Sequence, residues 1–360
     1  MRRCRNCLIP DAVPGVELSK DGICNHCAGD SPTLDPAADE AVRREREENL
    51  ERALVDARRH GGAYDCIVAL SGGKDSLYLL YKLKVEYRLR VLAYTVDINI
   101  PQVAWQNIRR TVAQLDVDHL TYSPPRSLYE KLFRYLLRNQ EERGAVYTVS
   151  YVYAPLFEGD AIRLAIEKDV PLVLAGYSPG QPEAERMLYE FSRRLIRETD
   201  WTPPELARCG EFSADELAHF FDPRRFPAGT RFPRYLAPFH AWPYDQDRIM
   251  KDVVGLGLAA SGRHASPIHS NYPINWLLMY SDLKSFGFNP YAPEFSALIR
   301  QGKASRNYWR IMAPMVDAMI RHRIGPGREV TRSLQWLGLK PDELRITKPR
   351  GAYDPVLTPA

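Results

Sequence analysis

Residues 67–76 read Ile67-Val68-Ala69-Leu70-Ser71-Gly72-Gly73-Lys74-Asp75-Ser76, a short apolar run that passes directly into a glycine-rich turn. The apolar run predicts a buried parallel strand, and leucines at helical spacing after the turn predict a helix from about Ser76. Such a turn directs free backbone N–H groups and the positive end of the helix toward one point. The pattern therefore predicts an anion site, and a phosphate is the ligand that suits it.

The side chains of the turn offer a phosphate different groups. The two glycines let the backbone approach phosphate oxygens without a Cβ atom in the way, and the Ser71 and Ser76 hydroxyls add donors. Lys74 supplies positive charge. Asp75 repels an anion unless a cation stands between them, so we expect Mg²⁺ to bridge Asp75 and pyrophosphate. The spacing differs from the GxxxxGK[ST] of P-loop nucleotidases.

The residues that follow alternate short apolar runs with helical patterns. We expect strands at 65–70, 90–96, 118–122 and 170–175, and helices at 76–85, 103–115, 128–142 and 154–168. Strands that alternate with helices predict a parallel sheet covered on both faces. Ligands bind at the carboxyl ends of such strands, so Gly176 and Tyr177 should face the same site. Gln181, Glu183 and Glu185 follow, as metal ligands or as ordinary surface groups.

Four of the six cysteines form two CxxC pairs, Cys4 with Cys7 and Cys24 with Cys27. The sixteen residues between the pairs fall in the range of a zinc ribbon or knuckle. We expect Zn²⁺ in a structural site, because four thiolates leave no open coordination position. An iron–sulfur cluster also accepts four thiolates and stays an alternative, whereas disulfides do not suit the cytosol.

Composition limits the class of protein. The chain has 360 residues, of which 45% are hydrophobic and 26% charged, as in a globular protein of roughly two or three domains. No run approaches the roughly 18 apolar residues of a membrane helix, and no secretory signal is apparent, so we expect no membrane partner and a cytoplasmic location. The interspersed charge, +4 in total, neither requires nor excludes nucleic acid.

SGGKDS after a hydrophobic strand resembles the SGGxDS signature of the PP-loop ATP pyrophosphatase superfamily, the adenine nucleotide alpha hydrolase-like enzymes. Members split ATP between the α and β phosphates, activate an oxygen of a second substrate as an adenylate, and let ammonia, an amine or a sulfur donor displace AMP. The resemblance assigns ATP and pyrophosphate binding to Leu70, Ser71, Gly72, Gly73, Ser76, Thr95, Asp97, Gly176 and Tyr177, catalysis to Lys74, Asp75 and Ser76, and magnesium to Asp75.

The expected fold class is thus α/β, with a parallel, five-stranded-type PP-loop (HUP-like) sheet and helices on both faces. We expect a zinc-binding module at 1–30, a linker helix at 31–62, the PP-loop ATP-binding domain at 63–190, and a mostly helical acceptor-binding region at 191–360. Many superfamily members are dimers, which makes a homodimer a candidate assembly.

The opening, Cys4-x-x-Cys7-Leu8-Ile9-Pro10-Asp11 and then Asp21-Gly22-Ile23-Cys24-Asn25-His26-Cys27, is similar to the amino terminus of the N-acetyl sugar amidotransferases. Residues 282–288 and 299–303 resemble that family as well. The resemblance implies ATP-dependent conversion of an oxygen of a small-molecule acceptor, such as a sugar carboxylate, to an amide. The chain shows no candidate glutaminase domain, so a separate glutaminase would supply the ammonia.

Candidate acceptor-binding residues lie late in the chain. His264, His269, Ser270 and Asn271 precede a predicted helix, and an acceptor site there competes with helix capping by Ser270 and Asn271. Two further candidates are Arg300 and Lys303, which could bind a carboxylate or phosphate. A solvated helix face would show the same sequence.

Sulfur transfer to a tRNA base or a small molecule is the competing function. It needs a thiolate that carries sulfur, or three cysteines that hold a cluster, close to the loop. Only Cys66 and Cys209 remain outside the paired set, the first inside a predicted strand and the second without a neighbouring cysteine. The cysteine count therefore favours nitrogen transfer.

Overall fold

The computed structural model describes residues 1–29, 36–179 and 201–354, so the predicted polar groups Gln181, Glu183 and Glu185 and the boundary expected at 190 lie outside it. At its centre is a parallel five-stranded sheet with strand order β3-β2-β1-β5-β6. Its strands are β1 (Cys66–Ala69), β2 (Val91–Val96), β3 (Asp118–Tyr122), β5 (Leu172–Ala175) and β6 (Arg234–Leu236). The predicted α/β class with a parallel sheet is confirmed.

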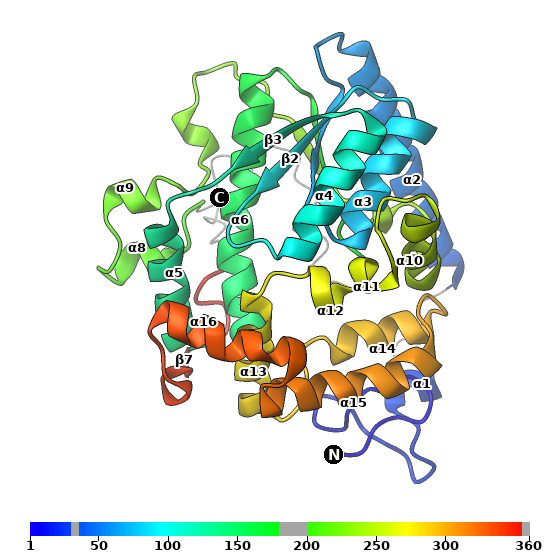
Figure 1. Cartoon of the computed structure of the whole chain (residues 1–360), viewed down its shortest axis with the longest axis vertical. Helices are drawn as coiled ribbons and strands as arrows, with labels where there is room; N and C mark the ends of the chain where they lie inside the picture. The colour runs from blue at the N-terminus through cyan, green and yellow to red at the C-terminus, as the bar shows by residue number, and fades with distance from the viewer. Residues whose placement is uncertain (30–35, 180–200, 355–360) are drawn as a thin grey trace.

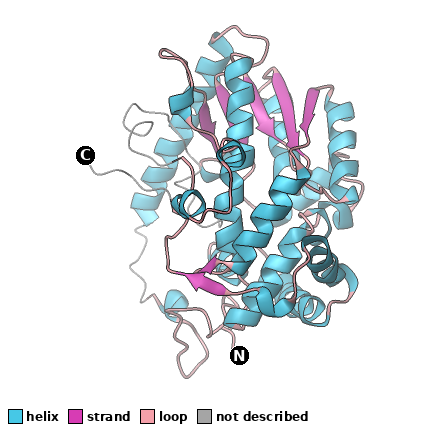
Figure 2. Ribbon diagram, turned by 90° about the vertical axis from the view of Figure 1, so that its left-hand side faces the viewer, coloured by secondary structure: helices cyan, strands magenta, loops and turns pink. Residues whose placement is uncertain are grey.

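Both faces of the sheet are covered, as Figure 2 shows. Alternate residues of one strand point to opposite faces, so Cys66 and Val68 pack against α2 (Pro36–Arg59), α3 (Lys74–Tyr81) and α4 (Gln102–Leu115). Ile67 packs on the other face against α6 (Ala145–Glu167). Burial on both faces explains why β1, β2 and β5 are continuous apolar runs, whereas β3 at the sheet edge is half exposed.

Two elements begin or end away from their predicted bounds. Helix α5 (Arg126–Arg138) stops short of 142, because residues 140–141 form β4 (Gln140–Glu141), which pairs with β7 (Ile346–Lys348). Helix α6 starts at Ala145 instead of 154, and Pro155 lies inside it. The carboxylate of Asp282 accepts hydrogen bonds from the backbone N–H groups of Ala145 and Val146, so a distant residue caps this start.

The fifth strand, β6, lies in the stretch that the sequence predicts to be helices and loops. It has three residues and pairs in register with β5, Leu172 opposite Arg234. A strand this short, in a segment dense in proline and aromatic residues, shows no alternation. The region after residue 200 therefore completes the central sheet.

Most of the other elements after residue 200 are helices. They are α8 (Pro204–Arg208), α9 (Ala214–Leu217), α10 (Gln246–Gly255), α11 (Gly262–Ala265), α12 (Pro267–Ser270), α13 (Ile274–Phe286), α14 (Ala292–Arg300), α15 (Arg306–His322) and α16 (Glu329–Leu337). Helices α5, α6, α13, α15 and α16 share a second apolar core. The amino-terminal segment, with α1 (Asn25–Ala28), lies beside α14 and α15 (Figure 1).

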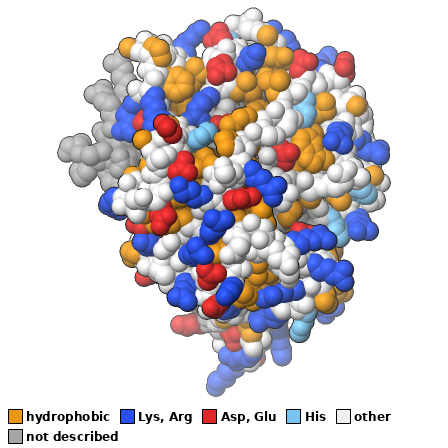
Figure 3. Space-filling model, turned by 60° about the vertical axis from the view of Figure 1, so that its left-hand side comes forward, with side chains coloured by type: hydrophobic (Ala, Val, Ile, Leu, Met, Phe, Trp, Pro, Cys, Tyr) orange, Lys and Arg blue, Asp and Glu red, His pale blue; other side chains and the backbone are white. Residues whose placement is uncertain are grey.

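Charged groups of both signs are interspersed over the face seen in Figure 3, in keeping with the small net charge. Among the helices of the described ranges, none is both long and apolar enough to cross a bilayer.

Candidate functional site

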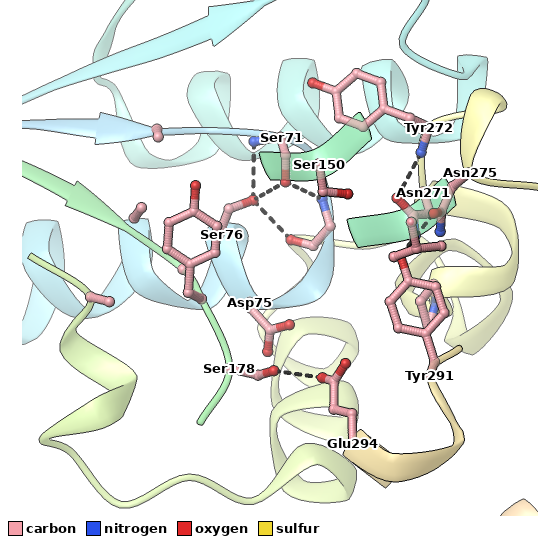
Figure 4. A pocket seen from close by; sticks show the side chains of 18 of the residues that line it. Ser71, Asp75, Ser76, Ser150, Ser178, Asn271, Tyr272, Asn275, Tyr291 and Glu294 are labelled. Carbon is pink, nitrogen blue, oxygen red and sulfur yellow. Dashed lines mark hydrogen bonds between the residues drawn. The ribbon is translucent and has the colours of Figure 1, made fainter. Parts of the chain in front are cut away.

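The turn after β1 is closed by its own serines (Figure 4). The Ser76 hydroxyl donates to the carbonyl of Gly73 at 3.0 Å and accepts from the backbone N–H of Ser71 at 3.2 Å. The hydroxyl oxygens of Ser71 and Ser76 are 3.2 Å apart. Helix α3 starts at Lys74, directly after this turn, so its first N–H groups face the turn. Strand, turn and helix start thus have the arrangement that the sequence predicts, and the serines fix the shape of the turn.

The two glycines of the turn differ in their surroundings. Gly72 has φ +79°, and a Cβ atom there would lie 2.5 Å from the carbonyl oxygen of Ala104 in α4. The side-chain amide of Asn107 donates to the Gly72 carbonyl at 2.9 Å. A Cβ atom on Gly73 would meet only the Ser71 hydroxyl, at 3.6 Å. Gly72 is therefore required by packing against α4, while Gly73 leaves the wall of the site open.

Strand β5 ends against the same helix start. A Cβ atom on Gly176 would lie 2.9 Å from the backbone carbon of Asp75, so only glycine lets the strand end approach α3 this closely. Gly176 and Tyr177 both line the cavity in front of the turn, as their position at a strand end predicts.

Strand β2 contributes different residues from those expected. Thr95 is buried and donates to the Leu70 carbonyl at 2.7 Å, and Asp97 accepts from the backbone N–H groups of residues 99 and 100. Neither lines the cavity, whereas Tyr94 and Val96 do. The reason is strand geometry, because neighbouring side chains point to opposite faces. Thr95 therefore holds the turn through Leu70 and does not face the cavity.

Lys74 and Asp75 form a network with Tyr244, in which Lys74 and Tyr244 are buried and Asp75 is partly exposed to the cavity. The Lys74 ammonium lies 2.6 Å from one oxygen of Asp75 and donates to the Tyr244 hydroxyl at 3.1 Å. The Tyr244 hydroxyl donates to the other Asp75 oxygen, also at 3.1 Å. Lys74 is 7% exposed and Tyr244 5% exposed. Sequence reasoning did not single out Tyr244, because it precedes α10 in a segment remote from the turn and dense in proline and aromatic residues.

A cavity of about 1390 Å³ opens in front of the turn. Small-molecule pockets span roughly 300–1,000 Å³, so this one has room for a nucleotide together with a second substrate. Asn271, Asn275 and Tyr291 lie across the cavity from the turn (Figure 4). Gln246 Oε1 and Trp309 Nε1 are buried at its wall without a hydrogen-bond partner in the described parts of the chain.

Two further carboxyl groups line the cavity, the buried Glu158 and the half-buried Glu294, and neither was predicted as a site residue. Glu294, at the start of α14, accepts from the Ser178 hydroxyl at 2.9 Å (Figure 4). Glu158 of α6 accepts from the Tyr177 hydroxyl at 2.7 Å. Burial raises the pKa of each carboxyl to about 7. No local motif marks them, since both are single acidic residues on helices.

The predicted acceptor residues separate into two groups. Ser270 and Asn271 line the cavity, and neither caps α13, which starts after Pro273 without a side-chain cap. His264, His269, Arg300 and Lys303 do not line it.

Three of the four residues that do not line the cavity have contacts outside it. The His264 ring lies 2.9 Å from the Ser261 hydroxyl, and the Lys303 carbonyl accepts from the backbone N–H of Gln246. The Arg300 guanidinium donates to Cys7 Sγ at 3.3 Å, so α14 directs this cation toward the cysteines.

The four paired cysteines converge on one point. All their sulfur atoms lie within 4.8 Å of one another, with Cys7 and Cys24 3.6 Å apart and Cys4 and Cys27 3.8 Å apart. Four thiolates about 2.3 Å from one tetrahedral ion lie about 3.8 Å apart, so the group has the dimensions of a single-ion site. Burial and the neighbouring thiols raise the pKa of Cys24 to about 11, and a cation would remove that penalty.

The cysteine module is fixed to the carboxyl-terminal helices. Arg306 at the start of α15 donates to the Arg5 carbonyl from Nε at 2.9 Å, and Arg3 pairs with Asp317 of α15 at 2.9 Å. Arg3 and Asp317 both line the cavity. The module therefore forms part of the cavity wall, together with α15.

No family model matches the chain. A stretch of 48 residues is 44% identical to an uncharacterized protein from Methanocaldococcus jannaschii. The match covers 13% of this chain and spans about a sixth of that relative, 17% of its length.

Three solved structures share parts of the fold. NMN synthetase from Francisella tularensis is 12% identical with a TM-score of 0.35, over 85% of this chain and 97% of that one. NH3-dependent NAD synthetase from Campylobacter jejuni is 13% identical with a TM-score of 0.35, over 81% and 96%. The U34-tRNA thiolase NcsA from Methanococcus maripaludis, with its [4Fe-4S] cluster, is 13% identical with a TM-score of 0.37, over 94% and 89%.

Likenesses this weak assign no reaction to the chain, and the resemblance to the sugar amidotransferases stays a prediction. The function is therefore inferred from the residues of the site.

Proposed function

We propose that this chain is an ATP-dependent, AMP-forming enzyme that activates an oxygen of a small-molecule acceptor and transfers ammonia or an amine to it. The observation that carries the proposal is the glycine-rich turn at the start of α3, which is followed by Lys74 and Asp75 and opens into a cavity large enough for two ligands. An adenylating enzyme needs both features, because ATP and acceptor must react side by side.

The residues of the turn fit the pyrophosphate half of ATP. The N–H groups and positive end of α3 face the phosphates, and Gly73 leaves room for their oxygens. Lys74 adds a cation that offsets negative charge on the departing pyrophosphate. The Asp75 carboxylate, 21% exposed and directed at the cavity, is a suitable Mg²⁺ ligand. When bound, Mg²⁺ would neutralise phosphate charge.

The acceptor would occupy the opposite wall, where Ser270, Asn271 and Asn275 offer uncharged donors and acceptors. Attack by an acceptor oxygen on the α-phosphorus forms the new P–O bond and breaks the bond to pyrophosphate. The amine then forms a bond to the activated carbon, and AMP leaves with the oxygen. No protein nucleophile is required, and a separate glutaminase subunit is the proposed source of ammonia.

Cysteine placement favours nitrogen over sulfur as the transferred atom. All six cysteines lie in the described ranges, and none of them lines the cavity. Cys66 is fully buried in β1, where burial raises its thiol pKa, and Cys209 Sγ donates to the Leu206 carbonyl at 3.3 Å. A persulfide relay would need one of these sulfurs at the cavity.

We also propose that the four paired cysteines hold one structural Zn²⁺. The support is the short sulfur–sulfur separation and the absence of an open ligand position. An iron–sulfur cluster would place its four cysteines around several metal atoms and so spread them further apart.

The test is AMP formation from ATP, ammonia and a panel of candidate carbonyl and carboxylate acceptors, with products detected by mass spectrometry. Asp75→Asn should abolish AMP formation in a variant that still folds, as circular dichroism can show, although its urea midpoint should fall because the buried Lys74 loses its counter-charge. Asp118→Asn, at the opposite end of the sheet, is the matched control and should behave as wild type. Normal AMP formation by Asp75→Asn would contradict the assignment of Asp75.

A Cys66→Ala, Cys209→Ala double variant tests the alternative. Full AMP-forming activity is expected, because neither thiol reaches the cavity. Complete loss of activity in a folded double variant would favour sulfur transfer.

A further inference from the structure

Tyr244 is the feature of the site that the proposed reaction leaves without a role. It reaches the turn from the segment between the 3-10 helix Pro238–His240 and α10, about 170 residues later in the chain than Lys74. Its hydroxyl contacts both charged side chains at once. The two oxygens of Asp75 thereby receive different donors, Oδ1 from the Tyr244 hydroxyl and Oδ2 from Lys74.

The hydroxyl is fixed by the packing of its ring. The Tyr244 ring meets Phe239 edge to face with centroids 5.6 Å apart, and both side chains are buried. One proton serves one donor bond, to Asp75, while the oxygen accepts from Lys74. Each bond therefore has a fixed direction.

Without this hydroxyl, Lys74 would keep its ion pair with Asp75 and a contact with the Tyr244 ring, whose centroid lies 5.7 Å from Nζ. A tight ion pair satisfies both charges, but it competes with ligand binding. In the proposed reaction Asp75 binds a cation and Lys74 binds a phosphate, so the two side chains must separate. A third group bonded to both can keep the carboxylate and the ammonium oriented when the pair separates. Only the hydroxyl contacts both side chains, because the Tyr244 ring lies near Lys74 alone.

Resting on the proposed function, we infer that Tyr244 is a positioning residue, whose hydroxyl directs the Asp75 carboxylate to the cation and the Lys74 ammonium to the pyrophosphate. The carboxyl-terminal region then supplies part of the ATP site in addition to the acceptor wall.

The test compares Tyr244→Phe with Tyr78→Phe. Tyr78 stacks on the same Phe239, with centroids 6.3 Å apart, but does not line the cavity, so it is a matched control for loss of one hydroxyl. Calorimetric titration with inorganic pyrophosphate, with and without Mg²⁺, reports binding independently of turnover. Bonds to charged groups predict that Tyr244→Phe weakens binding about 10- to 100-fold when Mg²⁺ is present. The loss without Mg²⁺ should be smaller, and Tyr78→Phe should match wild type.

The kinetic counterpart is a fall in kcat for AMP formation that exceeds any rise in the KM for ATP. Wild-type pyrophosphate binding by Tyr244→Phe, with Asp75→Asn inactive, would overturn the inference and leave the proposed function standing. Equal losses with and without Mg²⁺ together with a lowered urea midpoint would also overturn it, because they indicate a packing defect. A wild-type protein that neither binds pyrophosphate nor forms AMP would instead refute the proposed function.

Discussion

Replacing Gly72 by alanine should destabilise the whole protein, although the added group is a single methyl. The residue has φ +79°, a conformation that costs a residue with a Cβ atom roughly 1–2 kcal/mol. The new Cβ atom would also lie 2.5 Å from the Ala104 carbonyl oxygen and 2.9 Å from its Cα atom. Both are backbone atoms of α4 and cannot rotate away, so overpacking adds about 1–3 kcal/mol. The expected total is about 2–5 kcal/mol, a large share of the roughly 5–15 kcal/mol of a typical domain.

Gly73→Ala is the matched control, because it adds the same methyl one residue later. Its Cβ atom would meet only the Ser71 hydroxyl at 3.6 Å, an ordinary contact, and Gly73 has φ −80°. The free energy of unfolding should change by no more than about 0.5 kcal/mol. The methyl would, however, stand in the cavity where a phosphate oxygen approaches, so ATP affinity should fall.

Urea unfolding of the two variants, followed by circular dichroism, measures the first effect, and calorimetric titration with Mg·ATP measures the second. The expected pattern is a lowered urea midpoint for Gly72→Ala alone and weak ATP binding by a stable Gly73→Ala. Equal midpoints for Gly72→Ala and wild type would refute the packing argument. A Gly73→Ala variant that binds ATP normally would show that phosphates do not approach this part of the turn.

Two further predictions concern other sites. Elemental analysis of the purified protein should find about one zinc per chain, and several irons per chain would contradict a single-ion site. Cys7→Ser should lose the metal and unfold at a lower temperature in calorimetry. Burial raises the pKa of Glu158 from 4.5 to about 7. At a pH between these two values the folded protein keeps a proton on Glu158 that the unfolded chain has released. The free energy of unfolding therefore falls as pH rises through this range. Glu158→Gln should therefore be more stable than wild type at pH 8, by an amount on the order of 2–3 kcal/mol, and similar to it at pH 4; equal pH dependence in urea unfolding would show that Glu158 does not titrate in this way.

The sequence reveals the features that neighbouring residues determine together. Strand β1, the turn and the start of α3 are consecutive, so their apolar run, glycines and leucines stand in one short stretch. The cysteine pairs are equally visible, because two CxxC spacings constrain four sulfurs whatever surrounds them. The alternation of strands and helices up to residue 175 likewise predicted the parallel sheet.

Features that depend on residues far apart in the chain could not be predicted from the sequence. The start of α6 is capped by Asp282, far along the chain, while Pro155 indicates a later start that the helix does not use. Tyr244 reaches Asp75, and Glu294 reaches Ser178, only because the carboxyl-terminal region packs across the ends of the strands. The prediction that Arg300 binds the acceptor rested on its charge alone. In the structure its guanidinium donates a hydrogen bond to Cys7 Sγ instead.

The attachment of the cysteine module to α14 and α15 bears on the order of events during synthesis. Its contacts join residues 293, 301 and 314 positions apart in the chain, so the module leaves the ribosome long before the helices that hold it. At about 5–20 residues per second, the interval is roughly 15–60 s. During that time the four thiols are exposed to the metal and oxidant levels of the cell. The Zn²⁺ proposed above could therefore bind the module before the helices that hold it have been made.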